Sequence, residues 1–307
     1  MDKNQLNGNQ TKGYLLVALS GSLWGTIGFF ATLLSGMGLD PLMTAFLRLT
    51  MASLLLFIIL LIIGKGMSLF RISKRGLLSC ALIGVISQAF YNAFYMITID
   101  KTGMATAAVL LYTSPVFTAI MSRIFFGESF SSNKIIAIAV NVVGCVLTVT
   151  GGNFGGMNIS ALGVIFGVLS GFTYALMPVF SRVGADHEHP LTSAFYGLVF
   201  GVPALFFIAQ PWNGIGAEFT PQMLLVLFGY GLLPSALTYI IYFKGLSMVT
   251  ETSKVAVLCS LETIVAAIIG YLAFQESFTV AKVIGVALVF GSIVIMNSGK
   301  QAGTKDA

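Results

Sequence analysis

Glu262 is the residue whose type and position most clearly indicate chemistry. It lies near the centre of an apolar stretch, Val255 to Phe274, that holds no other formally charged residue. If this stretch crosses a membrane, a charge at its centre costs on the order of 3 kcal/mol, and apolar surroundings favour the protonated form of a carboxyl group. Glu262 is therefore predicted to be a proton-coupling or substrate-binding acid that faces a hydrated cavity. A neutral glutamate that only hydrogen-bonds a neighbouring helix is the alternative.

Arg48 is a second charge within an apolar segment, about 12 Å from the start of that segment at Asp40. A guanidinium does not usefully deprotonate, so it needs an anion, a carbonyl group or water. Three roles remain open from the sequence. Arg48 could hold the carboxylate of an amino-acid-like substrate, pair with Glu262, or satisfy helix-end carbonyls near Pro115.

Polar and aromatic side chains form a third candidate group. Gln88, Tyr91, Asn92 and Tyr95 follow each other at i, i+3, i+4 and i+7, and a similar stripe lies at Ser235, Thr238, Tyr239 and Tyr242. This spacing places each set on one face of an α-helix. A cavity would use such a face to stack rings and bind a small polar solute, whereas a dry bundle would use it for interhelical hydrogen bonds. The candidate binding or coupling residues are Glu262, Arg48, Gln88, Tyr91, Asn92, Tyr95, Tyr239, Trp24, Tyr112 and Ser114.

Long apolar segments must position these residues. The chain is 57% hydrophobic and 9% charged, with a mean hydropathy of +0.94, whereas soluble domains are about 25% charged. Segments long enough to cross a bilayer as helices occur at 13–35, 40–64, 76–99, 103–126, 133–151, 158–181, 190–209, 219–243, 252–274 and 279–298. They lack the alternation of barrel strands, and the first lacks a signal-peptide cleavage site. The expected fold class is an all-α membrane protein with ten transmembrane helices.

Charge distribution predicts the orientation. With the N-terminus inside, thirteen Lys and Arg residues fall on one face and two, Lys101 and Lys282, on the other. Because Lys and Arg resist translocation, both termini are predicted to be cytoplasmic. This topology accounts for the net charge of +5, so nucleic-acid binding is not indicated. The cysteines and histidines lack metal-ligand spacing, so no metal and no cofactor is predicted.

The second half of the chain repeats the first. "LSGSLWG" at 19–25 returns as "LSGFTYA" at 169–175, and residues 107–134 align without a gap on 255–282. Each copy holds five predicted helices, an odd number, so the second copy enters the membrane from the opposite side. Such inverted repeats are a recurrent construction of secondary transporters. The predicted division is a cytoplasmic tail at 1–12, five-helix repeats at 13–151 and 152–298, and a second cytoplasmic tail at 299–307.

Two minor patterns favour structural roles. Glu128 and Glu276 end the fourth and ninth segments beside Ser and Thr residues, as is typical of turns and helix caps. Rows of glycines predict close helix packing, at Gly21 and Gly25 and at Gly163, Gly167 and Gly171.

The chain resembles the drug/metabolite transporter superfamily in its ten-helix form with two EamA-type repeats. The resemblance covers nearly the whole chain and rests on Trp24, Gly25, Arg48, Ser114, Pro115, Gly127, Glu128, Ser129, Gln275, Glu276, Ser277, Gly144, Gly285 and Gly291. It implies a polytopic inner-membrane carrier, often an exporter of amino acids or other small metabolites. Many members carry Glu-Pro in the ninth helix, whereas here Thr263 follows Glu262. The ninth helix is therefore expected to lack the kink that Pro115 gives the fourth.

The sequence predicts a secondary transporter that works by alternating access. We expect an exporter of neutral or aromatic amino acids or related amphipathic compounds, coupled to protons through Glu262. Uptake of sugars, nucleotide sugars or other metabolites is the open alternative. The expected partners are a small-molecule substrate and the lipid bilayer; one chain suffices, although the fifth and tenth helices could pack between two copies.

Other classes fit the sequence less well. No Gly-x4-Gly-Lys-Ser/Thr motif is present, so gradients rather than ATP would supply energy. An intramembrane enzyme would need a Ser/His or His/Asp constellation at depth, but neither histidine lies in a predicted span. A channel is the remaining rival.

Overall fold

The computed structural model describes residues 3–63, 67–155, 160–185, 188–214 and 219–298. Over these residues the regular elements are all helical, and ten helical spans are long and apolar enough to cross a membrane. This agrees with the ten spans predicted from the sequence. The first helix begins at Lys3, within the predicted tail 1–12. The predicted tail 299–307 lies outside the described residues.

Each half contributes five of the spans. The first half comprises α1 (Lys3–Trp24), α2 (Ile27–Gly36), α3 (Pro41–Ile63), η1 (Met67–Phe70), α4 (Lys74–Leu82), η2 (Ile83–Phe90), α5 (Tyr91–Thr102), α6 (Met104–Leu111), α7 (Ser114–Phe126) and α8 (Ser132–Thr150). The second half comprises α9 (Ala161–Ala185), α10 (Pro190–Val199), α11 (Gly201–Ala209), η3 (Pro211–Gly214), α12 (Pro221–Gly231), η4 (Leu232–Leu237), α13 (Thr238–Leu246), α14 (Thr252–Cys259), α15 (Leu261–Phe274) and α16 (Val280–Ser298).

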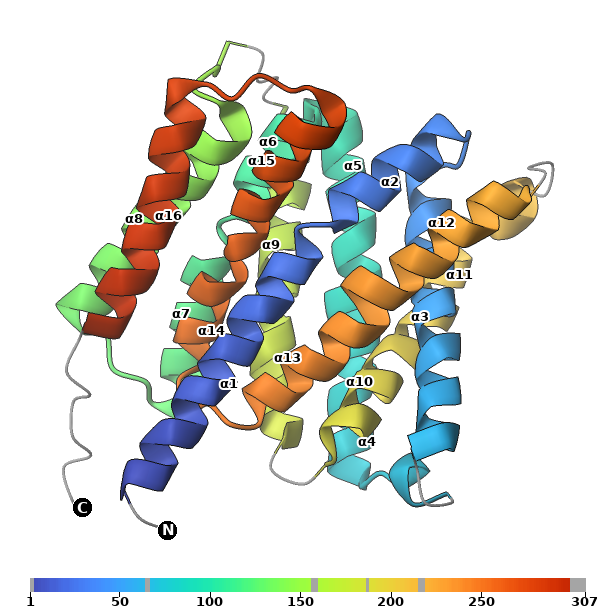
Figure 1. Cartoon of the computed structure of the whole chain (residues 1–307), viewed down its shortest axis with the longest axis horizontal. Helices are drawn as coiled ribbons and strands as arrows, with labels where there is room; N and C mark the ends of the chain where they lie inside the picture. The colour runs from blue at the N-terminus through green and yellow to red at the C-terminus, as the bar shows by residue number, and fades with distance from the viewer. Residues whose placement is uncertain (1–2, 64–66, 156–159, 186–187, 215–218, 299–307) are drawn as a thin grey trace.

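The two ends of the bundle differ in what they carry. Helix α1 begins and α16 ends at the same end of the bundle, which we call the termini face (Figure 1). Each half has five spans, so α9 starts at the other end, the opposite face. The second half thus traverses the bundle in the reverse direction from the first.

One hydrophobic core joins the two halves. Its members that are at most 1% exposed include residues of α1, α3, α10, α13 and α14, namely Val17, Leu49, Leu198, Tyr242 and Val255. Because both repeats contribute to this core, neither half completes its own packing alone.

Glycines let particular helices approach closely. Helices α8 and α16 lie side by side at one edge of the bundle (Figure 1). A Cβ atom at Gly144 would lie 2.8 Å from the backbone nitrogen of Val289, and one at Gly285 would lie 2.5 Å from that of Thr148. The fifth and tenth helices therefore pack against each other within one chain.

The glycine rows predicted for close packing lie against the interrupted spans. A Cβ at Gly25 would lie 2.7 Å from the carbonyl oxygen of Glu262, and one at Gly171 would lie 2.6 Å from the Thr113 hydroxyl. These contacts confirm the packing role of the rows.

Six of the ten spans are not continuous α-helices. The fourth and ninth spans are each divided, into α6 and α7 and into α14 and α15. The third and eighth spans each contain a wider π-helical turn, η2 and η4, at repeat-related positions. Interrupted spans leave backbone groups without intrahelical partners, which is tolerated at membrane depth only beside protein or a hydrated cavity.

Candidate substrate site

The fourth span is interrupted where the sequence places a proline. Helix α6 ends at Leu111 and α7 begins at Ser114, with Pro115 in its first turn. Proline lacks a backbone N–H and fixes φ, so it suits the start of a helix and not its interior. The Thr113 hydroxyl donates to the Leu110 carbonyl at 2.7 Å and so satisfies one acceptor at the break.

The ninth span is interrupted without a proline, so the expectation of an unkinked helix was wrong. Helix α14 ends at Cys259 and α15 begins at Leu261. The Ser260 hydroxyl donates to the Val257 carbonyl at 2.6 Å, and the Thr263 hydroxyl donates to the Ser260 carbonyl at 2.8 Å. Hydroxyl side chains therefore donate hydrogen bonds to backbone carbonyl groups around this break.

Asn141 supports the break from a different span. Its amide nitrogen, on α8, donates to the Ser260 hydroxyl at 2.6 Å and to the Ser292 hydroxyl of α16 at 3.0 Å. All three side chains are at most 4% exposed. Sequence reasoning missed Asn141, although an asparagine in the middle of an apolar span is a recognisable signal.

Glu262 lies in the first turn of α15, directly after the break. The Tyr112 hydroxyl is 3.5 Å from its Oε1 atom and the Tyr174 hydroxyl is 3.4 Å from its Oε2 atom. The N-terminal end of a helix carries a partial positive charge that stabilises a carboxylate. Glu262 thus has two phenol donors and a helix dipole available to its charged form, and its side chain is only partly buried.

Two adjoining cavities lie beside this acid. Both are small: one is lined by Glu262, Tyr112 and Ser114, and the other by Trp24 and Tyr242 among others. Both are also bounded by the same four residues, Ser114, Tyr174, Ala256 and Cys259. The two cavities are therefore adjacent, one beside the acid and the other beside the aromatic residues Trp24 and Tyr242.

The aromatic wall combines residues of both halves. The Trp24 ring lies 5.6 Å from that of Tyr239 and 5.0 Å from that of Tyr242, measured between centroids. The Gln88 amide donates to the Tyr239 hydroxyl and lies 3.5 Å from the Met177 sulfur atom. Two predicted site residues, Gln88 of the third span and Tyr239 of the eighth, thus lie together, and the hydrogen bond between them fixes both side chains.

The four stripe residues of the third span do not line either of the two cavities described above. The Asn92 amide donates to the Gln88 carbonyl at 2.6 Å, within its own span, and so caps a group at the end of the π-helical turn. Tyr91 stacks on Tyr95 at 5.9 Å and lies 5.2 Å from Tyr174. The prediction assumed a regular α-helix, whereas the π turn alters the side-chain register.

Arg48 is 5% exposed and lies apart from Glu262, with which it forms no ion pair. Its guanidinium is 5.6 Å from the centre of the Tyr230 ring. Its Nε atom is buried and has no hydrogen-bond partner among the described residues. Of the three roles open from the sequence, pairing with Glu262 is not the one observed.

The cavities offer one acid, two phenol hydroxyls and aromatic surfaces. No group of three or more His, Cys, Asp or Glu side chains within the described residues could hold a metal ion. A carboxylate can hold a proton or pair with a cationic group, and aromatic rings such as that of Trp24 can pack against an apolar group.

Comparison with known families identifies the chain. The EamA-like transporter family matches twice, at residues 11–150 and 161–298, and so accounts for both repeats. The chain belongs to the EamA-like transporter family. It is therefore a transporter and not an enzyme, and the resemblance to the drug/metabolite transporters is confirmed.

Relatives of this EamA-like transporter share most of its length. An uncharacterized transporter of Archaeoglobus fulgidus is 28% identical over 284 residues, which cover 92% of this chain and 95% of the relative. The uncharacterized inner membrane transporter YicL of Salmonella typhimurium is 24% identical over 293 residues, covering 94% and 96%. A solved crystal structure has the same fold, with a TM-score of 0.76 at 16% identity over 92% of this chain and 96% of that one.

Proposed function

We propose that this EamA-like transporter exports a neutral or aromatic amino acid, or a related amphipathic compound, by proton-coupled alternating access. The observation that carries the proposal is the position of Glu262, in the first turn of a broken helix and on the wall of a cavity. In inverted-repeat transporters, such half-helix ends near the middle of the membrane bind substrates and coupling ions.

The surroundings of Glu262 suit an exchange between a proton and a substrate cation. Its two oxygens lie 3.5 and 3.4 Å from phenol hydroxyls, distances that leave both hydrogen bonds weak. A substrate ammonium group could therefore replace the proton at the carboxyl without breaking a strong local network. The aromatic wall at Trp24 and Tyr242 would then pack against an apolar side chain.

Arg48 supports a zwitterionic substrate in particular. Its buried Nε atom has no acceptor among the described residues, and a buried unsatisfied donor is unfavourable. A substrate carboxylate would satisfy that donor. For this to occur, a path must open between the cavities and Arg48, which does not line either of them in this conformation.

We propose further that the transporter lies in the inner membrane with both termini in the cytoplasm. The excess of Lys and Arg in the loops of one face supports this orientation. The name of the relative YicL, an inner membrane transporter, supports the same location.

The direct test of the proton-coupling role is Glu262→Gln in proteoliposomes. The amide keeps the size of the side chain and an oxygen that accepts from Tyr112 or Tyr174, but it does not ionise in this range. We expect proton-driven transport to fall to background and the remaining exchange to lose its dependence on pH. The control is Asp100→Asn, since Asp100 is 71% exposed and pairs with its neighbour Lys101. Wild-type rate and pH response in E262Q would refute proton coupling at this residue.

A thermal-shift screen tests the substrate class, because a ligand that binds only the folded state raises the melting temperature. We expect aromatic and branched neutral amino acids to stabilise the protein. Stabilisation by sugars or nucleotide sugars instead would favour the alternative, for which stacking on the aromatic wall is the supporting observation.

A further inference from the structure

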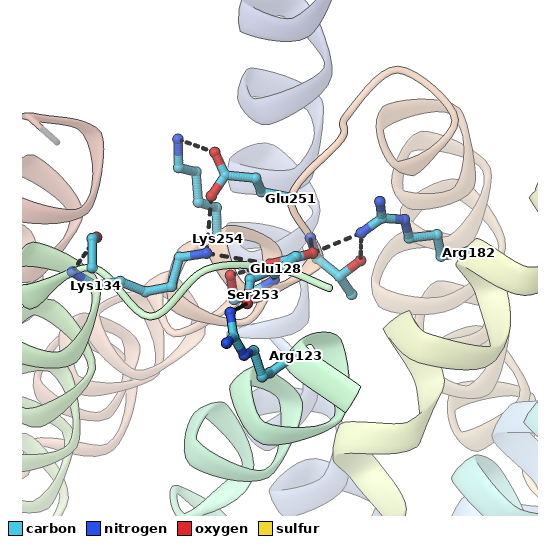
Figure 2. Close-up of polar contacts among 9 residues, drawn as sticks. Arg123, Glu128, Lys134, Arg182, Glu251, Ser253 and Lys254 are labelled. Atoms are coloured by element: carbon cyan, nitrogen blue, oxygen red, sulfur yellow. Dashed lines mark hydrogen bonds and ion pairs between the residues drawn. The ribbon is translucent and has the colours of Figure 1, made fainter. Parts of the chain in front are cut away.

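A buried cluster of charges joins the two halves at the termini face (Figure 2). Its centre is Glu128, in the connection between α7 and α8 and 7% exposed. Its carboxylate accepts hydrogen bonds from Arg182 at 2.6 Å, from the backbone nitrogen of Thr252 at 2.6 Å and from the Ser253 hydroxyl at 2.5 Å. Lys134 adds an ion pair at 3.4 Å. Glu128 therefore caps α14 of the other half, whereas the sequence predicted a local turn or cap.

The repeat-related carboxylate has different surroundings. Glu276 aligns with Glu128 and Lys282 aligns with Lys134, and the local pair is present in both halves, at 2.9 Å between Glu276 and Lys282. The Glu276 side chain, however, is 55% exposed. Among the described residues, Lys282 is the side chain to which its carboxylate binds.

The first residues of α14 and of its repeat counterpart α6 also differ in burial. Thr252 and Ser253, at the start of α14, are each 1% exposed. Their repeat counterparts, Met104 and Ala105, are exposed, and α6 has no side-chain cap. Repeat-related segments thus occupy different environments, buried at the termini face and exposed at the opposite face. The Glu-Lys pair is the same in both halves, so the exposure of Glu276 is not set by that pair and we attribute it to the conformation.

We infer that Glu128 and Glu276 form a pair of alternating latches. In the conformation described here, Glu128 holds the start of α14 and closes the termini face. In the other conformation Glu128 releases α14, and Glu276 binds the start of α6 at Met104 and Ala105 and closes the opposite face. The inference rests on the alternating-access mechanism proposed above but on no particular substrate and no proton.

The two latches are unequal in their donors. Ser253 is replaced by Ala105 in the alignment, and Arg182 is replaced by Thr32. The second latch therefore lacks a hydroxyl and a guanidinium that the first one has. This difference favours the conformation with a closed termini face in the absence of substrate.

Native Cys259 provides the readout, because it lines both cavities. With Cys80 and Cys145 replaced by alanine, a membrane-impermeant maleimide reports access to Cys259 from each side of oriented proteoliposomes. The measured quantity is the ratio of the labelling rate from the termini face to that from the opposite face, which does not require a known substrate.

The variants shift this ratio in opposite directions. We expect Glu128→Gln to raise it about tenfold, the factor that follows from the loss of one hydrogen bond to a charged group. Glu276→Gln lowers it by a smaller factor, and the double variant E128Q/E276Q returns it toward the wild-type value. Ser253→Ala removes one donor to Glu128 and raises the ratio less than E128Q does, which keeps the test available if E128Q does not fold.

Matched controls remove one carboxylate from each face. Glu188→Gln does so at the termini face, where Glu188 accepts from the Ser73 backbone at 2.8 Å. Asp100→Asn does so at the opposite face. Both should leave the ratio unchanged. Shifts of E128Q and E276Q in the same direction, or no shift in either, would overturn the latch assignment; failure of amino acids to bind or be transported would not affect this readout and would concern the proposed substrate alone.

Discussion

Replacement of Asn141 by leucine tests what maintains the break in the ninth span. Both side chains have four heavy atoms and branch at Cγ, so Asn141→Leu removes the polar contacts while it keeps the shape of the side chain, although leucine is bulkier. Asn141 is 0% exposed and its amide donates two hydrogen bonds, to Ser260 at 2.6 Å and to Ser292 at 3.0 Å. No other side chain in the described residues donates to either hydroxyl.

The expected magnitude follows from these contacts. Both serine hydroxyls also donate to carbonyls of their own helices, at 2.6 Å for Ser260 and 2.7 Å for Ser292, so neither loses its acceptor in the variant. The loss therefore comprises two interhelical hydrogen bonds and the weak contact in which the Cys145 thiol donates to the Asn141 Oδ1 atom at 3.9 Å. Such bonds contribute roughly 0.6 kcal/mol each on average and up to about 1.7. N141L should lower the free energy of unfolding by about 1 to 2 kcal/mol.

Reversible unfolding in mixed micelles measures this free energy. A double-mutant cycle of Asn141→Leu with Ser260→Ala isolates the interaction energy between the two side chains. We expect a coupling of about 0.6 kcal/mol between Asn141 and Ser260. The control is Asn297→Leu, because Asn297 is exposed and hydrogen-bonds its own helix. If N141L matches the wild type in stability, or if the cycle gives no coupling, the Asn141 hydrogen bonds do not stabilise the folded break.

Two further predictions concern packing and pH. Gly285→Ala should destabilise by about 1 to 3 kcal/mol because its Cβ meets a backbone atom at 2.5 Å, whereas Gly291→Ala, with nothing within 4 Å, should be neutral or slightly stabilising in the same unfolding assay. Partial burial of Glu251 disfavours its charge, but its ion pairs with Lys254 and Lys134 prevail and lower the pKa of Glu251 below its ordinary value. This stabilisation is present at neutral pH and is lost as pH falls through the lowered pKa. Glu251→Gln should therefore lower the melting temperature near neutral pH, and the difference from wild type should shrink in acid; equal melting temperatures at both would refute the assignment.

Local features of the chain sufficed to predict the spans. Hydropathy and length define a membrane helix because each span must satisfy its own backbone in lipid. The same reasoning singled out Glu262, since a charge within an apolar span is unfavourable without a role. The binding role of the stripe on the third span stays a prediction, and hydropathy did not indicate the π-helical turn that precedes Tyr91.

The sequence by itself determined ten helices in two related halves, with an acid in the ninth span. Only the tertiary structure decided that the ninth span breaks at Ser260, because its support comes from Asn141, 119 residues away. Only the tertiary structure also decided the different surroundings of Glu128 and Glu276. They occupy equivalent places in the repeat, but the Glu128 side chain is 7% exposed and the Glu276 side chain is 55% exposed. Local hydropathy specifies that a helix forms, whereas packing between distant helices specifies which polar groups meet and which end of the bundle is closed.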